Sequence, residues 1–399
     1  MRILIANDGF GDAGGVQSYL DAVVPALRAR GHATAVLHCD LQPAARATGA
    51  LGGVDEISVA RSGLDGAAVQ VSRWQPDVVY SHNMSRLDVE RRLMDAAPVV
   101  KFMHGYFGTC IGGQKMFGMP SAAPCSRRFG AACLLFYGPR RCGPLDLTTF
   151  AHQYGWAHDQ QALFNGYHAV VVASDHMRRE YVAHGINGDR VHVNPLFPTH
   201  QEQPEAATAP QRSVVFFGRM TNLKGGDLLI EAVGDASRRL GSAIALTMVG
   251  DGPQRAAWEQ VAAEHRVDAN FVGWRTGAER WAFMRGAALV AVPSVWPEPF
   301  GLVGLEAGAL GVPAIAFDVG GIREWLTPGE NGILVPGDPP RAANLASALA
   351  DAFGRPDDLA RMGAAAIRVA RRLSLAAHVD RLEAVLAPAA EVCAHSAGR

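Results

Sequence analysis

Two glutamates, Glu298 and Glu306, stand on either side of an expected helix start, with seven residues between them. An apolar stretch at 289–292 predicts a buried strand that ends in a loop rich in proline and aromatic residues. Pro299 and Gly301 then mark the start of a helix. We therefore expect Glu298 in the loop before the helix and Glu306 between one and two turns inside it.

The start of that helix suits a phosphate group, because the first N–H groups of a helix have no partner within the helix. A carboxylate on each side then has a chemical use: Glu306 would accept both hydroxyls of a ribose, and Glu298 the hydroxyls of a sugar. The alternative is two acids favoured by the helix macrodipole. It explains Glu298 but not Glu306, since a charge inside an apolar helix needs a partner. The other residues expected at this phosphate-binding helix start are Phe300, Gly301, Leu302 and Val303.

A second candidate group is an arginine and a lysine five positions apart, Arg219 and Lys224, after an expected strand at 213–217. The arginine offers a fork of N–H donors to phosphate oxygens, and the lysine a compact charge. A leaving diphosphate gains negative charge as a glycosidic bond breaks, so cations there stabilise the transition state more than the ground state. The alternative is a solvated pair at the surface.

Near the N-terminus, Gly9, Gly11 and Gly14 form a GxGxxG between an expected strand and an expected helix, with Asp40 after the next strand. Such a loop is typical of dinucleotide sites, where backbone N–H groups approach a pyrophosphate. The match is weak in a chain with 44 glycines. Three interpretations stay open: an NAD-type site, a loop in which Gly14 and Gly15 touch a phosphate or sugar, and a plain turn.

Two expected strands of the first half end in histidines, His82 and His104. A single histidine is more often a hydrogen-bonded structural residue than a catalytic one. Two at parallel strand ends are expected to face one cleft, where an imidazole can donate to a sugar hydroxyl or carbonyl. In the second half, Trp274 follows a strand and is placed to face a nucleobase.

Four of the six cysteines fall in the segment 105–144, at spacings of 15, 8 and 9 residues. These spacings fit no standard zinc signature, and disulfides are disfavoured in a cytoplasmic enzyme. Buried or loosely paired thiols and a structural metal site both stay open. Long loops rich in glycine and proline tend to be functional, so we expect the segment to shape an acceptor pocket. The four residues are Cys110, Cys125, Cys133 and Cys142.

The composition restricts the class of protein. The chain has 399 residues, 49% of them hydrophobic, and a formal net charge of -1. These values predict a soluble globular protein of two domains, with no basic excess for nucleic acid. No apolar run is long enough to span a membrane. The first residues already form a buried-strand pattern rather than a secretion signal, so we expect a cytoplasmic location, with a peripheral membrane contact left open.

The elements that hold these residues alternate between short apolar strands and helices, which predicts two α/β domains with parallel sheets. Ligands bind beyond the carboxyl ends of the strands in such sheets, so two facing edges would form one deep cleft. The expected units are a domain at 1–200, a linker at 201–212, a domain at 213–373 and a C-terminal helix at 374–399. Strands are expected at 3–6, 33–37, 78–81, 99–103, 169–173, 191–193, 213–217, 243–249, 269–272, 289–292, 314–317 and 332–335.

Together these motifs resemble the retaining glycosyltransferases of family 4, which have the GT-B architecture of two Rossmann-like domains facing across a cleft. The resemblance extends over nearly the whole chain, and its most specific mark is the Glu298 and Glu306 pair with Pro-Phe-Gly between. It implies that Arg219 and Lys224 hold a donor diphosphate and that Glu306 holds the ribose. It further implies that Glu298 positions the donor sugar and that His104 lies by the sugar and the acceptor.

The same resemblance implies transfer of a hexose-type sugar from a UDP- or GDP-type donor to a small-molecule, glycan or lipid-linked hydroxyl acceptor. It implies retention of anomeric configuration, by a front-face route in which the leaving phosphate helps to deprotonate the acceptor. No metal ion and no cofactor is implied, since the cations replace the metal. The helix at 374–399 is expected to cross back to the first domain. The sequence departs from the family pattern in two places. The cysteine-bearing segment is long, which leaves the choice of acceptor open. The stretch 194–197 lacks the Asn-Gly-hydrophobic-Asp ending often seen at the domain junction, which leaves the details of the hinge open.

Three other functions stay open at this point. A dehydrogenase that uses the GxGxxG would leave both glutamates and both cations without a role. A sugar-nucleotide epimerase or a glycan phosphorylase would share the fold but carry out a different reaction. A subunit that binds a nucleotide sugar without turnover is the third.

Overall fold

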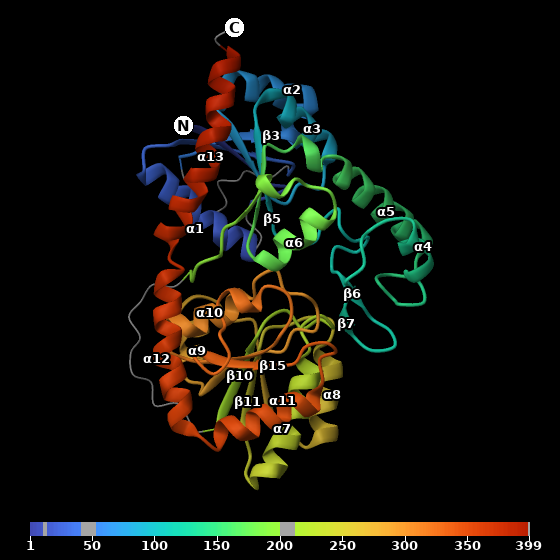
Figure 1. Cartoon of the computed structure of the whole chain (residues 1–399), viewed down its shortest axis with the longest axis vertical. Helices are drawn as coiled ribbons and strands as arrows, with labels where there is room; N and C mark the ends of the chain where they lie inside the picture. The colour runs from blue at the N-terminus through green and yellow to red at the C-terminus, as the bar shows by residue number, and fades with distance from the viewer. Residues whose placement is uncertain (11–13, 41–52, 200–211, 398–399) are drawn as a thin grey trace.

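The computed structural model describes residues 1–10, 14–40, 53–199 and 212–397, so nearly all of the expected linker lies outside the described residues. Within these ranges two α/β units lie one above the other in Figure 1. The first holds a seven-stranded sheet in the order β3-β2-β1-β4-β5-β8-β9, and the second a six-stranded sheet in the order β12-β11-β10-β13-β14-β15. All the strand pairs of both sheets are parallel. The predicted fold class, two Rossmann-like parallel-sheet domains, is confirmed.

The strands and helices have the following residue ranges. The strands of the first sheet are β1 (Arg2–Ala6), β2 (Ala33–His38), β3 (Asp55–Ser58), β4 (Val78–Ser81), β5 (Val99–Met103), β8 (Ala169–Val172) and β9 (Val191–Val193). Those of the second are β10 (Ser213–Phe217), β11 (Ala245–Val249), β12 (Ala269–Gly273), β13 (Leu289–Val292), β14 (Ala314–Phe317) and β15 (Gly332–Val335). The helices are α1 (Gly15–Ala29), α2 (Val59–Trp74), α3 (Leu87–Ala96), α4 (Ala132–Phe136), α5 (Leu147–Ala162), α6 (Asp175–Ala183), α7 (Gly226–Leu240), α8 (Arg255–His265), α9 (Gly277–Arg285), α10 (Leu302–Ala309), α11 (Ala342–Phe353), α12 (Pro356–Arg372) and α13 (Leu375–Ala397).

The central strands are buried on both faces, as is typical of parallel sheets covered by helices. Residues 3–6 of β1 have no exposed surface. Ile5 lies beside Val36 of β2 and Tyr80 of β4, so these neighbouring strands end at one edge of the sheet. α1 covers this region with a stripe at helical spacing formed by Tyr19, Leu20, Val23, Val24 and Leu27.

The C-terminal helix leaves the second domain and packs against the first (Figure 1). α12 contacts α10, whereas α13 contacts α1, β4 and β5. Arg30, directly after α1, pairs with Glu383 of α13 at 2.6 Å between nitrogen and oxygen. At the domain junction, the buried ring of His378 donates from Nδ1 to the carbonyl of Pro195 at 2.8 Å, and its Nε2 accepts from the hydroxyl of Tyr19 at 2.8 Å. Neither α13 nor any other helix in the described ranges is long and apolar enough to cross a membrane.

Three details of the fold differ from the sequence prediction. β3 was missed because its sequence, Asp-Glu-Ile-Ser, carries little apolar signal. The strand expected at 243–249 begins at Ala245, because the chain is still turning after α7: Gly241 is left-handed with φ 63°, and the backbone N–H of Ile244 donates to Ser237. The segment 105–144, expected as a loop, holds α4 and a short antiparallel hairpin of β6 (Met116–Phe117) and β7 (Ala123–Pro124).

Candidate active site

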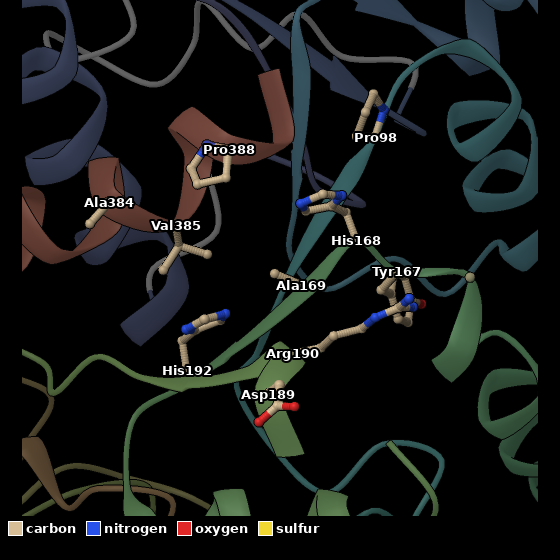
Figure 2. Close-up of a pocket in the computed structure, with 11 residues that line it drawn as sticks. Pro98, Tyr167, His168, Ala169, Asp189, Arg190, His192, Ala384, Val385 and Pro388 are labelled. Atoms are coloured by element: carbon tan, nitrogen blue, oxygen red, sulfur yellow. The ribbon is translucent and has the colours of Figure 1, made fainter. Parts of the chain in front are cut away.

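A cleft of about 330 Å³ lies between the two domains, where residues that follow β1, β4, β5 and β13 come together. Six of the predicted site residues line this cleft: Gly15, His104, Glu298, Phe300, Gly301 and Leu302. A second cavity, of about 490 Å³, lies on the opposite side of the first domain, at the start of β8 and β9 and against α13 (Figure 2). None of the predicted site residues lines that second cavity. The interdomain cleft is therefore the candidate site.

Glu298 is the centre of a buried charged group at this cleft. The residue is 5% exposed, and Oε1 lies 2.5 Å from Nζ of Lys224 and 2.5 Å from the hydroxyl of Ser294. Burial by itself would raise the pKa of Glu298, but the charge of Lys224 and the hydrogen bonds from Lys224 and Ser294 hold that pKa below its ordinary value. The carboxylate is therefore ionised and held in one position.

The backbone of Glu298 is held by a glycine-rich segment that follows β14. The N–H of Gly321 donates to the carbonyl oxygen of Glu298 at 2.7 Å. Gly320 is left-handed with φ 58°, and a Cβ on it would lie 2.2 Å from the same oxygen. Only glycine fits at 320, and this tight contact fixes the loop that presents the carboxylate.

Glu306 lies on α10 and is 1% exposed. It forms an ion pair with Arg280 of α9, whose Nη1 is 3.3 Å from Oε1, and it accepts a 2.7 Å hydrogen bond at Oε1 from the hydroxyl of Thr199. The partner that a buried charge requires is thus supplied by the chain itself. A carboxylate accepts about four hydrogen bonds, and Arg280 also occupies Oε2. Binding of two ribose hydroxyls therefore requires Thr199 to release Oε1.

The start of α10 forms one wall of the cleft. Gly301, directly before the helix, is left-handed with φ 78°, and a Cβ on it would lie 2.4 Å from Cδ1 of Ile322. No side chain caps the helix, and its first turn has no acidic residue, so its first N–H groups are available to an anion. Leu302 lines the cleft, while the side chain of Val303 packs against the apolar core of the second domain.

Six predicted donor residues are not among the described residues that line the cleft: Gly14, Arg219, Lys224, Trp274, Val303 and Glu306. Arg219 follows β10 and is exposed, and Trp274 follows β12 and is 57% exposed. Gly14 is an exposed, extended residue directly before α1, and Gly11 of the GxGxxG lies outside the described residues. Their roles stay predictions.

The two predicted histidines contact each other. Nδ1 of His82 lies 3.0 Å from Nε2 of His104, and the His104 ring stacks on Phe102 with 4.3 Å between ring centroids. Burial, together with the nearby charges of Lys101 and His378, lowers the pKa of His104 to about 3. A neutral imidazole therefore faces the cleft, while His82 lies behind it and lines a neighbouring cavity.

The four cysteines of the segment 105–144 are free thiols, each partly buried. Burial and the neighbouring cysteines raise the pKa of Cys142 to about 11, and burial raises that of Cys125. In the part of the chain that the structure describes, no group of three potential ligands is arranged to hold a metal ion. The thiols of Cys125 and Cys142 are therefore protonated at neutral pH. Cys133 and Cys142 pack against a small apolar cluster formed by Ile111, Phe129, Tyr137 and Ala157.

Family models match both halves of the chain. Residues 13–197 match the model described as Glycosyltransferase Family 4, and residues 211–353 match the one described as Glycosyl transferases group 1. The chain belongs to glycosyltransferase family 4. The sequence resemblance that rested on Glu298 and Glu306 is confirmed at the level of the family.

Curated relatives of this family 4 chain are similar to it over part of its length. It is 37% identical over 179 residues to D-inositol 3-phosphate glycosyltransferase of Corynebacterium glutamicum, a match that covers 43% of this chain and 42% of that protein. It is 38% identical over 181 residues to the Nocardia farcinica protein of the same name, covering 43% and 40%. The match thus spans about two fifths of the relatives' length.

Solved structures resemble the family 4 chain over almost its full length. HepE of Anabaena in complex with UDP-glucose has a TM-score of 0.70 at 20% identity, covering 97% of this chain and 100% of that one. Sucrose-phosphate synthase of Thermosynechococcus elongatus has a TM-score of 0.69 at 19% identity, covering 96% and 98%. Because the sequence identities are about 20%, the structural similarity shows that the chain has the GT-B fold.

Four residues of the family 4 site were missed by the sequence reasoning. Ser294 lies four positions before Glu298, a spacing that a search for polar neighbours could have found. Arg280 and Thr199, which hold Glu306, gave no signal because they are far from it in sequence. Tyr19 lines the cleft from the buried stripe of α1 and was not singled out in the sequence analysis.

Proposed function

We propose that this chain transfers a hexose-type sugar from a UDP-type donor to a hydroxyl acceptor, with retention of anomeric configuration and without a metal ion. The observation that carries the proposal is the ionised Glu298, held by Lys224 beside the open start of α10 in a cleft shared by two domains. The class of donor is supported by HepE, solved with UDP-glucose. The class of reaction is supported by the names of the curated relatives.

In the proposed reaction the donor diphosphate lies between Lys224 and the first N–H groups of α10. Lys224 has three N–H donors; one binds Glu298, which leaves two for phosphate oxygens. The bond between C1 and the phosphate oxygen breaks, and the acceptor oxygen bonds to C1 on the same face. The acceptor proton passes to the leaving phosphate oxygen. Lys224 and the helix N–H groups offset the charge gained by that phosphate.

The sugar is positioned by groups whose protonation states are fixed. Glu298, ionised and buried, accepts hydrogen bonds from sugar hydroxyls. His104 lies on the other side of the cleft, in the first domain, and is neutral because it is buried. It forms a hydrogen bond with a hydroxyl of the sugar. Since both groups are held by protein partners before the donor binds, little reorganisation is needed at the transition state.

UDP is expected to stabilise the protein against thermal unfolding more than GDP, ADP or TDP does. A ligand at 100 times its dissociation constant adds about 2.7 kcal/mol to the free energy of unfolding. The measurement is a thermal-shift screen with the four diphosphates, followed by detection of UDP released from UDP-glucose. No stabilisation by any of the four diphosphates, or stronger stabilisation by another diphosphate than by UDP, would contradict the proposal.

Glu306→Gln is expected to weaken UDP binding about tenfold, since hydrogen bonds to charged groups contribute about 1.5–3 kcal/mol. Binding of 2′-deoxy-UDP should change much less, because that ligand lacks one of the two hydroxyls. Isothermal titration with both nucleotides checks this. Equal weakening for the two nucleotides would assign Glu306 a purely structural role with Arg280.

A further inference from the structure

Exposed apolar side chains gather in the segment that follows β5. Of the nine large apolar residues that are exposed among the described residues, five fall between positions 119 and 147, and the other four are spread over the rest of the chain. Leu135 is 76% exposed and Leu147 is 79% exposed. We call the five residues the apolar face; they are Met119, Leu134, Leu135, Leu145 and Leu147.

The chain that carries the apolar face is held in one unit. The backbone N–H groups of Gly118 and Met119 both donate to the carbonyl of Arg140, at 2.8 and 3.1 Å, which joins the β6–β7 hairpin to the chain after α4. Tyr137, directly after α4, contacts Phe150 of α5 with 4.6 Å between ring centroids. Figure 1 shows this unit beside the first domain, with α4 at its outer end.

The same unit has an excess of positive charge. Lys115 is buried and paired with Glu180 at 2.5 Å. Apart from this lysine, the charged residues between 105 and 147 are one acid, Asp146, and four arginines, at 127, 128, 140 and 141. None of the four arginines forms an ion pair with an acid in the described part of the chain. Their charge is therefore available to a partner.

Two of these arginines also cover apolar surface. The guanidinium of Arg127 lies 3.9 Å from the centre of the Phe136 ring, and that of Arg140 lies 5.1 Å from the centre of the Phe117 ring. Arg128 is exposed, as is Arg141. Long cationic side chains can lie along apolar surface while the charged end reaches polar groups. The unit thus presents leucines and guanidinium groups together.

This combination matches an anionic lipid surface. Apolar side chains on a short surface helix enter the boundary between headgroups and acyl chains, and arginines bind lipid phosphates. Each arginine near an anionic membrane adds about 1 kcal/mol to the attraction. A second copy of this chain fits less well, because a two-fold contact sets the same surface against itself. The unpaired arginines of both copies would then meet, and like charges disfavour such a contact.

We propose that the apolar face and the four arginines bind the surface of a membrane that contains anionic lipids, with Leu135 and Leu147 inserted into the interface. The inference goes beyond the proposed sugar transfer and does not depend on it. It has a consequence for the cleft, because the segment begins next to His104. The hydroxyl of Tyr181 donates to the carbonyl of Gly105 at 2.6 Å, and Phe107 lines the cleft. Docking would thus fix the position of the cleft relative to the membrane.

The first test measures sedimentation of the full chain with vesicles. One set is phosphatidylcholine alone, and in the other about one third of the lipid is phosphatidylglycerol. We expect at least about tenfold stronger binding to the anionic set. Ionic strength of about 1 M shortens the screening length to about 3 Å and should reduce that binding. Equal binding to both sets, or binding to neither, overturns the inference.

The second test changes the two components separately. The double variant Leu135→Ser with Leu147→Ser removes apolar side chains that are exposed, so the fold should be kept. It is expected to weaken binding to the anionic vesicles about tenfold or more. The double variant Arg128→Gln with Arg141→Gln should weaken it about tenfold and reduce its dependence on salt. Unchanged binding in both double variants overturns the inference.

Matched controls lie on other elements. Val69→Ser removes an exposed apolar side chain from α2, and the double variant Arg371→Gln with Arg372→Gln removes two exposed cations from the end of α12. Both should bind the anionic vesicles as the wild type does. Stabilisation by UDP should persist in every variant, because none of the changed residues lines the cleft, so the donor site is tested separately.

Two further measurements locate the contact and identify its occupant. Hydrogen exchange with anionic vesicles should slow at 128–147 and stay unchanged over α2 and α12; slowing elsewhere with none at 128–147 overturns the inference. Sedimentation velocity without lipid should show no self-association that depends on the apolar face. A dimer that is lost in Leu135→Ser with Leu147→Ser, in a protein that does not bind vesicles, would assign the surface to a second copy instead.

Discussion

Glu298→Gln is expected to lower the turnover number about a hundredfold or more while the protein remains folded. The amide keeps the size of the side chain and one oxygen that can accept from Ser294. It loses the negative charge that pairs with Lys224, and with it the strong acceptor proposed to orient the donor sugar. The measurement is kcat for UDP release from UDP-glucose, with the unfolding temperature recorded for the same preparation.

The matched control is Glu383→Gln, which also removes a carboxylate from an ion pair. Glu383 of α13 pairs with Arg30 and His32 of the first domain, and none of these three residues lines the cleft. That variant should keep kcat near the wild-type value. A Glu298→Gln enzyme with near wild-type kcat would remove Glu298 from the mechanism. A large loss in unfolding temperature would instead assign the effect to folding.

The parts of the site that the sequence predicted are those with a local cause. Glu298, Gly301 and Leu302 were found because a proline and a glycine mark the end of a loop and the start of a helix, and the surrounding chain fixes their separation. The same holds for the strands of the second sheet, which are short apolar runs between clear turns. β13 and β14 begin and end at the expected residues.

The parts that the sequence did not predict depend on contacts between distant residues. The ion pair of Glu306 with Arg280 joins two helices 26 positions apart, and the contact of Lys224 with Glu298 spans 74 positions. Periodicity gives no information about such pairs. The direct contact between Lys224 and Glu298 was also not predicted, since the sequence placed the two residues on different parts of the donor.

A buried polar network links the first-domain half of the cleft to α13. Tyr19 lines the cleft, contacts the ring of His104, and donates to His378 of α13. His378 in turn binds Pro195 at the end of the first domain. α13 thus connects the hinge to a cleft residue, so the orientation of the first-domain groups depends on how this helix packs.

Lys224→Met is expected to raise the dissociation constant for UDP about tenfold or more and to lower kcat, since a charge-assisted hydrogen bond to phosphate contributes about 1.5–3 kcal/mol. The loss could act directly on the diphosphate or through Glu298, which would lose its partner. The double variant with Glu298→Gln separates these causes, because contacting residues show non-additive effects. If Lys224 acts only by holding Glu298, Lys224→Met should not weaken UDP binding further in the Glu298→Gln background. If it binds the diphosphate, the weakening should persist there. Arg238→Met, which removes an exposed cation from α7, is the control and should leave UDP binding unchanged; unchanged binding in Lys224→Met itself would remove the lysine from the donor site.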